Sequence, residues 1–128
     1  MQFFTKKNHL CCTVASRSTD IYTGLPYDMG FFSFVNELVY KNLKEKLGEK
    51  AEDLKLGHTT MKTNFTQIYD KTRTTALKMV ETYEKNKQPY TTDMPQIYDA
   101  QETLKDIYNK TQHTPVIKWI YNNAEFKN

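Results

Sequence analysis

The sequence predicts an α+β fold, in which a β-hairpin and a mixed or antiparallel sheet pack with about three helices. Two short runs rich in strand-forming residues stand at the N-terminus, and later segments carry apolar residues at helical spacing. The expected order of elements is ββ-α-β-α-α-β, which is typical of this class. With 128 residues and no repeat, linker or low-complexity tract, residues 1–128 are expected to form a single domain with one modest core.

The first half of the chain contains the clearest signals. Residues 2–6 and 9–16 are expected to be the two strands of the hairpin, joined by a Lys-Lys-Asn connection in which Asn tolerates a left-handed conformation. A Gly-Leu-Pro turn follows, and Pro26 suits the start of a helix. The helix itself is predicted over residues 27–47, with Gly48 closing its C-terminus.

The second half is expected to contain one extended segment, two helices and a last strand. The extended segment covers residues 53–62 and is interrupted by a glycine. The helices are predicted at about residues 64–87 and at residues 93–111, with a loop over residues 88–92 between them. Residues 115–121, with the sequence PVIKWIY, are predicted to be a strand.

The composition excludes several classes of protein. Aromatic residues make up 13% of the chain, which argues against intrinsic disorder although 26% of residues are charged. The 18 basic and 15 acidic residues are interspersed, so the net charge of +3 permits an anionic ligand but gives no specific nucleic-acid signal. No apolar run approaches the length of a transmembrane helix, and residues 1–10 contain no signal-peptide core, so no membrane partner is expected.

The two cysteines, Cys11 and Cys12, are adjacent in a predicted strand. Neighbouring side chains of a strand point to opposite faces, so these thiols are poor partners for a disulfide. Neither cysteine belongs to a Cys/His pattern with metal-ligand spacing, and no metal site is predicted. A reducing cytoplasmic compartment is the expected location.

Candidate ligand-binding residues cluster around the turn before the long helix. Arg17 offers a planar set of donors suited to phosphate, and Ser18 adds a hydroxyl beside it. Asp20 and Asp28 place two carboxylates close by in sequence. This combination suits a polar anionic ligand. The alternative interpretation is an exposed arginine, a capping serine and two acidic turn residues without a ligand.

Residues 2–28 resemble the thymidylate synthase and deoxycytidylate hydroxymethylase family. Members of that family share the pattern R-S-x-D-x-x-x-G-L-P-x-(N/D) after a hairpin that begins with Q-F, and this chain reproduces it without a gap. The matching residues are Gln2, Phe3, Leu10, Cys12, Arg17, Ser18, Asp20, Gly24, Leu25, Pro26, Tyr27 and Asp28. The resemblance is strongest over residues 2–40, fair to about residue 70 and weak beyond it.

The resemblance implies a role for each motif residue. Arg17 and Ser18 would hold the nucleotide 5′-phosphate, and Asp20 would lie at the edge of the folate site. Gly24 and Pro26 would shape the turn as scaffold residues. It also suggests a homodimer, because family members dimerise through their sheets, and a source in a bacteriophage.

The resemblance further implies that Asp28 recognises the pyrimidine base. Thymidylate synthases carry Asn at this position, whereas deoxycytidylate hydroxymethylases carry Asp. A carboxylate accepts a hydrogen bond from the 4-amino group of cytosine, which uracil lacks. Deoxycytidylate (dCMP) is therefore expected to be favoured over deoxyuridylate (dUMP).

The chain also departs from the family pattern. The family nucleophile is a Cys five residues before the position that Gln2 matches, so it would precede Met1, and the upstream catalytic Glu is absent with it. The His-x-Tyr pair that grips the sugar 3′-hydroxyl is replaced by Thr60 and Lys62. The C-terminal region is helical in its pattern where the family has sheet, and Trp119 is expected to pack in a core or on a sheet face.

Three functional hypotheses follow. An active pyrimidine nucleotide methyl- or hydroxymethyltransferase is disfavoured, because the chain lacks the family nucleophile. The favoured hypothesis is a catalytically inactive relative that binds a pyrimidine deoxynucleotide or a protein partner, with no catalytic residue of its own, since Cys12 matches a structural family position. The alternative is one chain of a split nucleotide methyl- or hydroxymethyltransferase, in which a complementing chain supplies the nucleophile. Methylene-tetrahydrofolate would be the cofactor only in the case of a split enzyme.

Overall fold

The computed structural model describes residues 1–87 and 93–123 and confirms the α+β class. The strands are β1 (Gln2–Lys6), β2 (His9–Ser16), β3 (Thr19–Asp20), β4 (Lys55–Thr63) and β5 (Thr66–Gln67). The helices are α1 (Leu25–Leu47), α2 (Asp70–Asn86), α3 (Ala100–Asn109) and α4 (Pro115–Asn123), with a short 3-10 helix at Gly48–Ala51.

The strands form a mixed sheet and a short extension of it. The main sheet has the order β1-β2-β4, in which β1 and β2 are antiparallel and β2 and β4 are parallel. Beyond it, β3 and β5 continue the same two chain segments as a parallel pair. The predicted hairpin is confirmed, and its connection contains two left-handed residues, Lys7 and Asn8.

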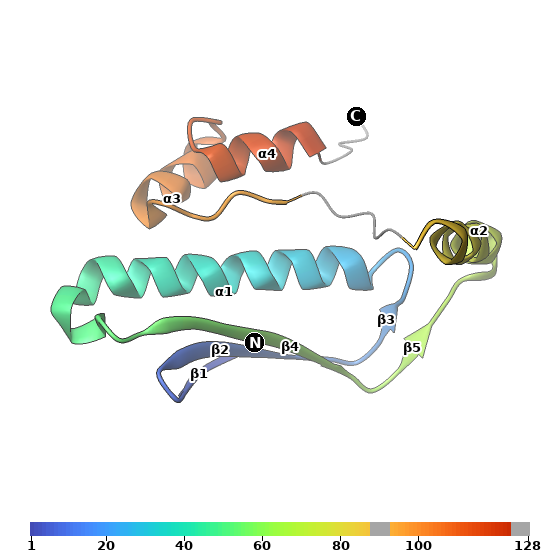
Figure 1. Cartoon of the computed structure of the whole chain (residues 1–128), viewed down its shortest axis with the longest axis horizontal. Coiled ribbons are helices and arrows are strands. Elements are labelled where there is room, and N and C mark those ends of the chain that lie inside the picture. The colour runs from blue at the N-terminus through green and yellow to red at the C-terminus, as the bar shows by residue number, and fades with distance from the viewer. Residues whose placement is uncertain (88–92, 124–128) are drawn as a thin grey trace.

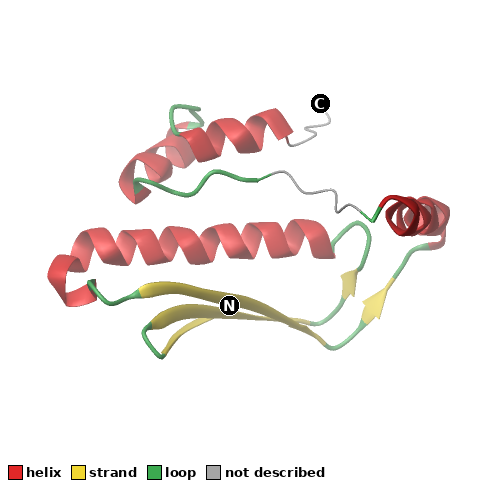
Figure 2. Ribbon diagram, viewed as in Figure 1, coloured by secondary structure: helices red, strands yellow, loops and turns green. Residues whose placement is uncertain are grey.

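The elements are stacked in layers, with α1 in the middle. The sheet lies along one side of α1, and α3 and α4 lie on the other side (Figures 1 and 2). Against the second side of α1, the buried residues Ile97, Val116 and Ile117 pack with Phe34 and Leu38. The central helix therefore packs against other elements on two sides, which explains why its apolar residues do not form one narrow stripe.

Gly57 allows β4 to pass close to β2. The pairing register shifts between Leu10 and Cys12, which marks a β-bulge opposite this glycine. A Cβ atom on Gly57 would lie 2.6 Å from the carbonyl oxygen of Leu10 and 2.7 Å from the Cys11 sulfur. No side chain fits at that position without moving the backbone of β2.

The predicted strand over residues 115–121 is wrong, because these residues form α4. Pro115 occupies the first helical position, where its missing amide costs nothing. The residue before it, Thr114, is held by the buried Asp106 carboxylate, which accepts from the Thr114 backbone amide and from its hydroxyl at 2.7 Å. This carboxylate, at the end of α3, orders the start of α4.

The two preceding helices begin later than predicted. Residues 66–67 pair with β3, so α2 starts only at Asp70. Residues 93–99 run in an irregular conformation along α1, and α3 starts at Ala100 after the N-cap Asp99. The predicted loop over residues 88–92 lies outside the described residues.

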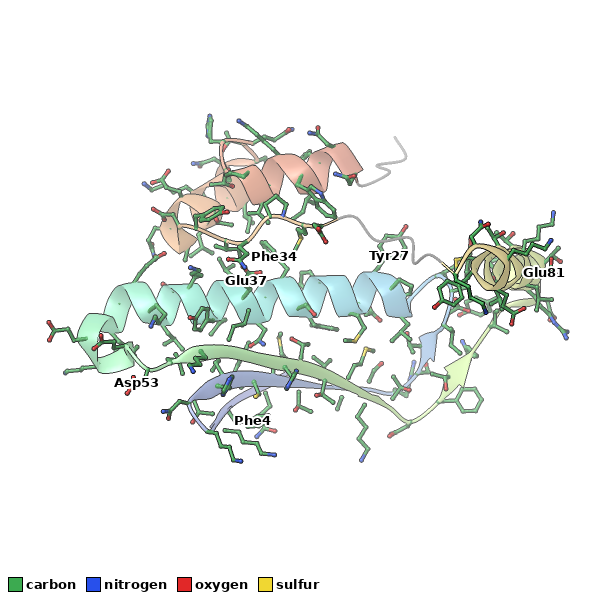
Figure 3. The ribbon with its side chains drawn as sticks, viewed as in Figure 1. Phe4, Tyr27, Phe34, Glu37, Asp53 and Glu81 are labelled. Atoms are coloured by element: carbon green, nitrogen blue, oxygen red, sulfur yellow. The ribbon has the colours of Figure 1, made fainter. Side chains whose placement is uncertain are left out.

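Two glutamates of α1 hold this irregular segment. The Glu37 carboxylate accepts from the Ile97 amide at 2.7 Å, and the Glu45 carboxylate accepts from the Ala100 amide at 2.7 Å. Figure 3 shows Glu37 and Phe34 on the side of α1 that faces this segment. Across the described ranges, no helix combines the length and apolar character needed to cross a bilayer.

Candidate functional site

Arg17 and Ser18 lie directly after β2, at the end of the main sheet. Both residues are exposed, and the Ser16 hydroxyl donates to the Ser18 carbonyl oxygen at 3.0 Å. Among the described residues, neither the Arg17 guanidinium nor the Ser18 hydroxyl has a hydrogen-bond or ion-pair partner. These donors are therefore free to meet a ligand from solvent.

Asp28 lies in the first turn of α1 and is brought next to this strand end by Thr19. The Thr19 hydroxyl, which directly follows Ser18 in sequence, donates to an Asp28 carboxylate oxygen at 3.4 Å. Thr19 is buried, whereas Asp28 is half-buried. The structure thus places Thr19, the residue after Ser18, beside Asp28 at one turn.

Gly24 makes this close approach feasible. A Cβ atom at Gly24 would lie 3.0 Å from the Thr19 hydroxyl and 3.1 Å from the Asp20 carbonyl oxygen. The Gly24 amide donates to that same carbonyl, and the Gly24 carbonyl accepts from the Asp28 amide at 2.9 Å. Pro26 occupies the first turn of α1. Both predicted scaffold residues therefore lie within the turn that carries Asp28.

Asp20 is buried, and its carboxylate is occupied by donors of the same chain. One oxygen accepts from the Tyr22 amide at 3.0 Å and from the Thr23 amide and hydroxyl, and the other accepts from the Tyr69 amide at 3.1 Å. The hydroxyl and amide of Thr23 hold the pKa of Asp20 below its usual range. These contacts give Asp20 a structural role in the turn, while its expected position at a folate edge stays a prediction.

The two cysteines are both inside the sheet. Cys12 is fully buried, and burial raises the pKa of its thiol, which disfavours the nucleophilic thiolate. Cys11 is also buried, and its thiol donates to the His9 carbonyl oxygen at 3.7 Å. Both thiols are therefore buried within the sheet and shielded from a ligand that approaches from solvent.

The residues that stand where the family has His-x-Tyr belong to β4. Thr60 pairs with Thr13, and Lys62 pairs with Ala15, in the parallel register of β2 and β4. Thr60 and Lys62 are exposed, whereas the alternate residues of β4 towards α1 are half-buried. Their side chains lie on the open face of the sheet, away from the first turn of α1.

An apolar groove that was not predicted from the sequence lies between α1 and α4. This groove has a volume of about 530 Å³. It is lined mainly by Tyr27, Phe31, Phe34, Met94, Trp119 and Ile120. Trp119 was expected on a strand, and the spacing of Val116, Ile117 and Ile120 was the signal that would have placed it on a helix.

Two further findings concern metal ligands and similarity to known proteins. Within residues 1–87 and 93–123, no group of three or more His, Cys, Asp or Glu side chains is arranged to hold a metal ion. In comparisons with known proteins, no family model, no curated protein and no solved structure matches the chain. The functional assignment therefore depends on the site geometry and on the motif that carries it.

Proposed function

We propose that this protein binds a pyrimidine deoxynucleoside monophosphate, dCMP in preference to dUMP, and that it is a thymidylate synthase-like protein without catalytic activity of its own. The observation that supports this best is the 3.4 Å contact between the Thr19 hydroxyl and the Asp28 carboxylate. It links the segment of Arg17 and Ser18, which would hold the phosphate, to Asp28, which would read the base. Nucleotide monophosphates are cytoplasmic metabolites, so the proposal places the protein in the cytoplasm.

The phosphate would be held by Arg17 and Ser18. Both side chains are exposed and without partners in the described part of the chain, so binding breaks no internal contact. A guanidinium donates two parallel hydrogen bonds to phosphate, and a hydrogen bond to a charged group is worth about 1.5–3 kcal/mol. The positive end of the α1 dipole lies at the same turn and favours an anion there.

The base would be selected by Asp28. Thr19 occupies one of its carboxylate oxygens, which fixes the carboxylate and leaves the other oxygen as an acceptor. The cytosine 4-amino group donates to such an acceptor, whereas uracil presents a carbonyl oxygen that repels it. A good base-edge contact discriminates by about 1–3 kcal/mol, which is enough for a clear preference.

A second candidate function is one chain of a split nucleotide methyl- or hydroxymethyltransferase. Its support is β1, which is exposed along its whole length, including Phe3 at 37% and Phe4 at 44%. Figure 3 shows Phe4 on the face of the sheet turned away from α1. A complementing chain that covers β1 would supply the nucleophile and the Glu, and methylene-tetrahydrofolate would be its cofactor.

Titration followed by NMR tests the nucleotide site. We expect dCMP to perturb the amides of residues 17–28 with a dissociation constant near 1 mM, which corresponds to about −4 kcal/mol, and dUMP to bind more weakly. Arg17→Ala should abolish binding of both nucleotides, and Asp28→Asn should shift the preference towards dUMP. Lys78→Ala, which removes the same charge from an exposed position of α2, should leave binding unchanged. The absence of any perturbation at several millimolar nucleotide would contradict the proposal.

A further inference from the structure

The helix α2 has little of its surface covered by the rest of the chain. Of its 17 residues, only Ala76 is buried. It lies at one end of the molecule, beyond the N-terminal end of α1, and Figure 3 labels Glu81 on it (Figures 1 and 3). Isolated helices of this length are marginally stable in water, and packing of an apolar face normally stabilises them. An uncovered apolar face on α2 therefore points to a partner.

Two adjacent faces of α2 have different surroundings. Thr72 and Ala76 lie on one face and are half-buried and buried, while Met79 and Tyr83 on the same face are 51% and 48% exposed. The neighbouring face carries Leu77, which is 55% exposed, and Val80, which is 51% exposed. We call this second face the outer seam; it consists of Arg73, Leu77, Val80 and Glu84, and all four residues are exposed.

The outer seam has the spacing of a helix-pairing surface. Its residues follow each other at intervals of four, three and four positions, so they form one continuous stripe along the helix. Two apolar residues lie at its centre, with a cation at the N-terminal end and an anion at the C-terminal end. Among the described residues, neither the Arg73 nor the Glu84 side chain forms a hydrogen bond or ion pair.

This arrangement is complementary to itself in one orientation. When two copies of α2 lie antiparallel about a two-fold axis midway between Leu77 and Val80, each Leu77 faces the Val80 position of the other copy. Each Arg73 then faces the Glu84 position of the other copy, which gives two ion pairs flanking an apolar centre. A parallel pair would instead bring like charges together, which is unfavourable.

We propose that the outer seam of α2 is an interface with a second copy of this chain, formed by antiparallel pairing of α2 with α2. This interface is isologous, as expected of a two-fold homodimer. One helix pair buries less area than a stable interface of about 1,200–2,000 Å², so the dimer is weak and dependent on concentration. The proposal is independent of nucleotide binding, because no residue of the outer seam belongs to the turn with Arg17 and Asp28.

Sedimentation equilibrium of the full chain with charge-reversed variants tests the pairing. The unaltered chain should show a monomer–dimer equilibrium on the order of 100 μM, as expected for a small interface. Arg73→Glu and Glu84→Arg should each weaken the dimer about 10-fold or more, because each variant places like charges opposite each other twice. Lys78→Glu makes the same charge change as Arg73→Glu on another face of α2, and it should leave the dimer unchanged.

The two variants also provide a rescue. A mixture of Arg73→Glu and Glu84→Arg chains should form a heterodimer, because both cross-pairs are then opposite in charge. The double variant Arg73→Glu/Glu84→Arg should dimerise again with itself for the same reason. Circular dichroism checks whether each variant is folded, and these exposed positions should tolerate the changes.

Three results would overturn the proposal. The first is an unaltered chain that stays monomeric at millimolar concentration. The second is a dimer that Arg73→Glu, Glu84→Arg and Leu77→Ala leave unchanged, which would place the copies against each other elsewhere, for example through the open face of the sheet. The third is a dimer weakened by either single variant but restored neither in the mixture nor in the double variant.

Discussion

The backbone amide of Tyr69 donates a 3.1 Å hydrogen bond to the Asp20 carboxylate, across 49 positions of the sequence. The other oxygen of the same carboxylate accepts from Tyr22 and Thr23 in the turn before α1. One buried side chain therefore connects the start of α2 to the turn that carries Asp28. Two parts of the chain that are distant in sequence depend on this carboxylate.

Replacement of Asp20 by Asn should loosen α2 more than α3. In the unaltered protein, both carboxylate oxygens of Asp20 accept hydrogen bonds from N–H groups. In the variant, the asparagine NH2 group would replace one of these oxygens and would face an N–H donor, so that contact becomes repulsive. We expect a lower thermal midpoint and faster hydrogen exchange of the amides of residues 70–86 than of residues 100–109. Asp53→Asn, a change at an exposed carboxyl, is the control. Equal loss of protection in α2 and α3 would contradict this coupling.

Stability should fall in acid because Asp20 and Asp106 must be ionised in the folded state. Thr23 lowers the pKa of Asp20; burial raises the pKa of Asp106, but donors from Thr114, Thr111 and His113 more than offset it and hold that pKa well below 3.8. A carboxyl whose pKa is lower when folded contributes stability above its unfolded pKa and loses it as pH falls through the folded pKa. The loss should therefore begin near pH 4 and continue below it.

Denaturant unfolding at a series of pH values measures this loss. Asp106→Asn should lower stability at pH 7 and flatten the acid decline, because one of the two responsible groups is removed. Asp53→Asn should leave the profile unchanged. A steep loss of stability between pH 5 and 8 instead would contradict this expectation.

Replacement by alanine should destabilise the protein at Gly57 and stabilise it at Gly30. At Gly57 the new Cβ would meet the Leu10 carbonyl at 2.6 Å, and forced repacking of this kind costs about 1–3 kcal/mol. At Gly30, inside α1, a Cβ would have no neighbouring atom within 4 Å, so Gly30→Ala should stabilise the protein by about 0.5–1 kcal/mol. Urea denaturation of both variants checks the two signs, and destabilisation by both would refute the assignment at Gly30.

The isolated chain should not convert dCMP in the presence of methylene-tetrahydrofolate. The two thiols of the chain are buried in the sheet, so neither reaches a base held by Asp28. Mass spectrometry of the nucleotide after long incubation is the measurement. A methylated or hydroxymethylated product that disappears in Cys11→Ser or Cys12→Ser would show that one of these thiols reacts.

The elements predicted correctly depend on local signals. The left-handed residues Lys7 and Asn8 set the hairpin, and the Gly-Leu-Pro turn sets the start of α1. The strand predicted over 115–121 was wrong because a short apolar run does not distinguish strand from helix. The Asp106 carboxylate, which holds Thr114 before α4, decides between them, and its contact is invisible to a local pattern.

In the candidate site, too, a local motif was visible in the sequence, whereas contacts between distant residues were not. Arg17, Ser18 and Asp28 were predicted from one continuous motif, and the structure brings their segments together through Thr19. The donors to Asp20 were not predicted, and one of them, the Tyr69 amide, comes from a residue 49 positions away. The outer seam of α2 was also missed, since its significance depends on knowing which face of the helix the body leaves uncovered.

The way α1 holds the irregular segment over residues 93–99 affects how this protein tolerates sequence change. Glu37 and Glu45 bind the backbone amides of Ile97 and Ala100, which every residue except proline possesses. The contact constrains the path of the segment without constraining the chemistry of exposed neighbours such as Tyr98. Those neighbours are thus free to diversify, while proline at position 97 or 100, or loss of either glutamate, should be selected against.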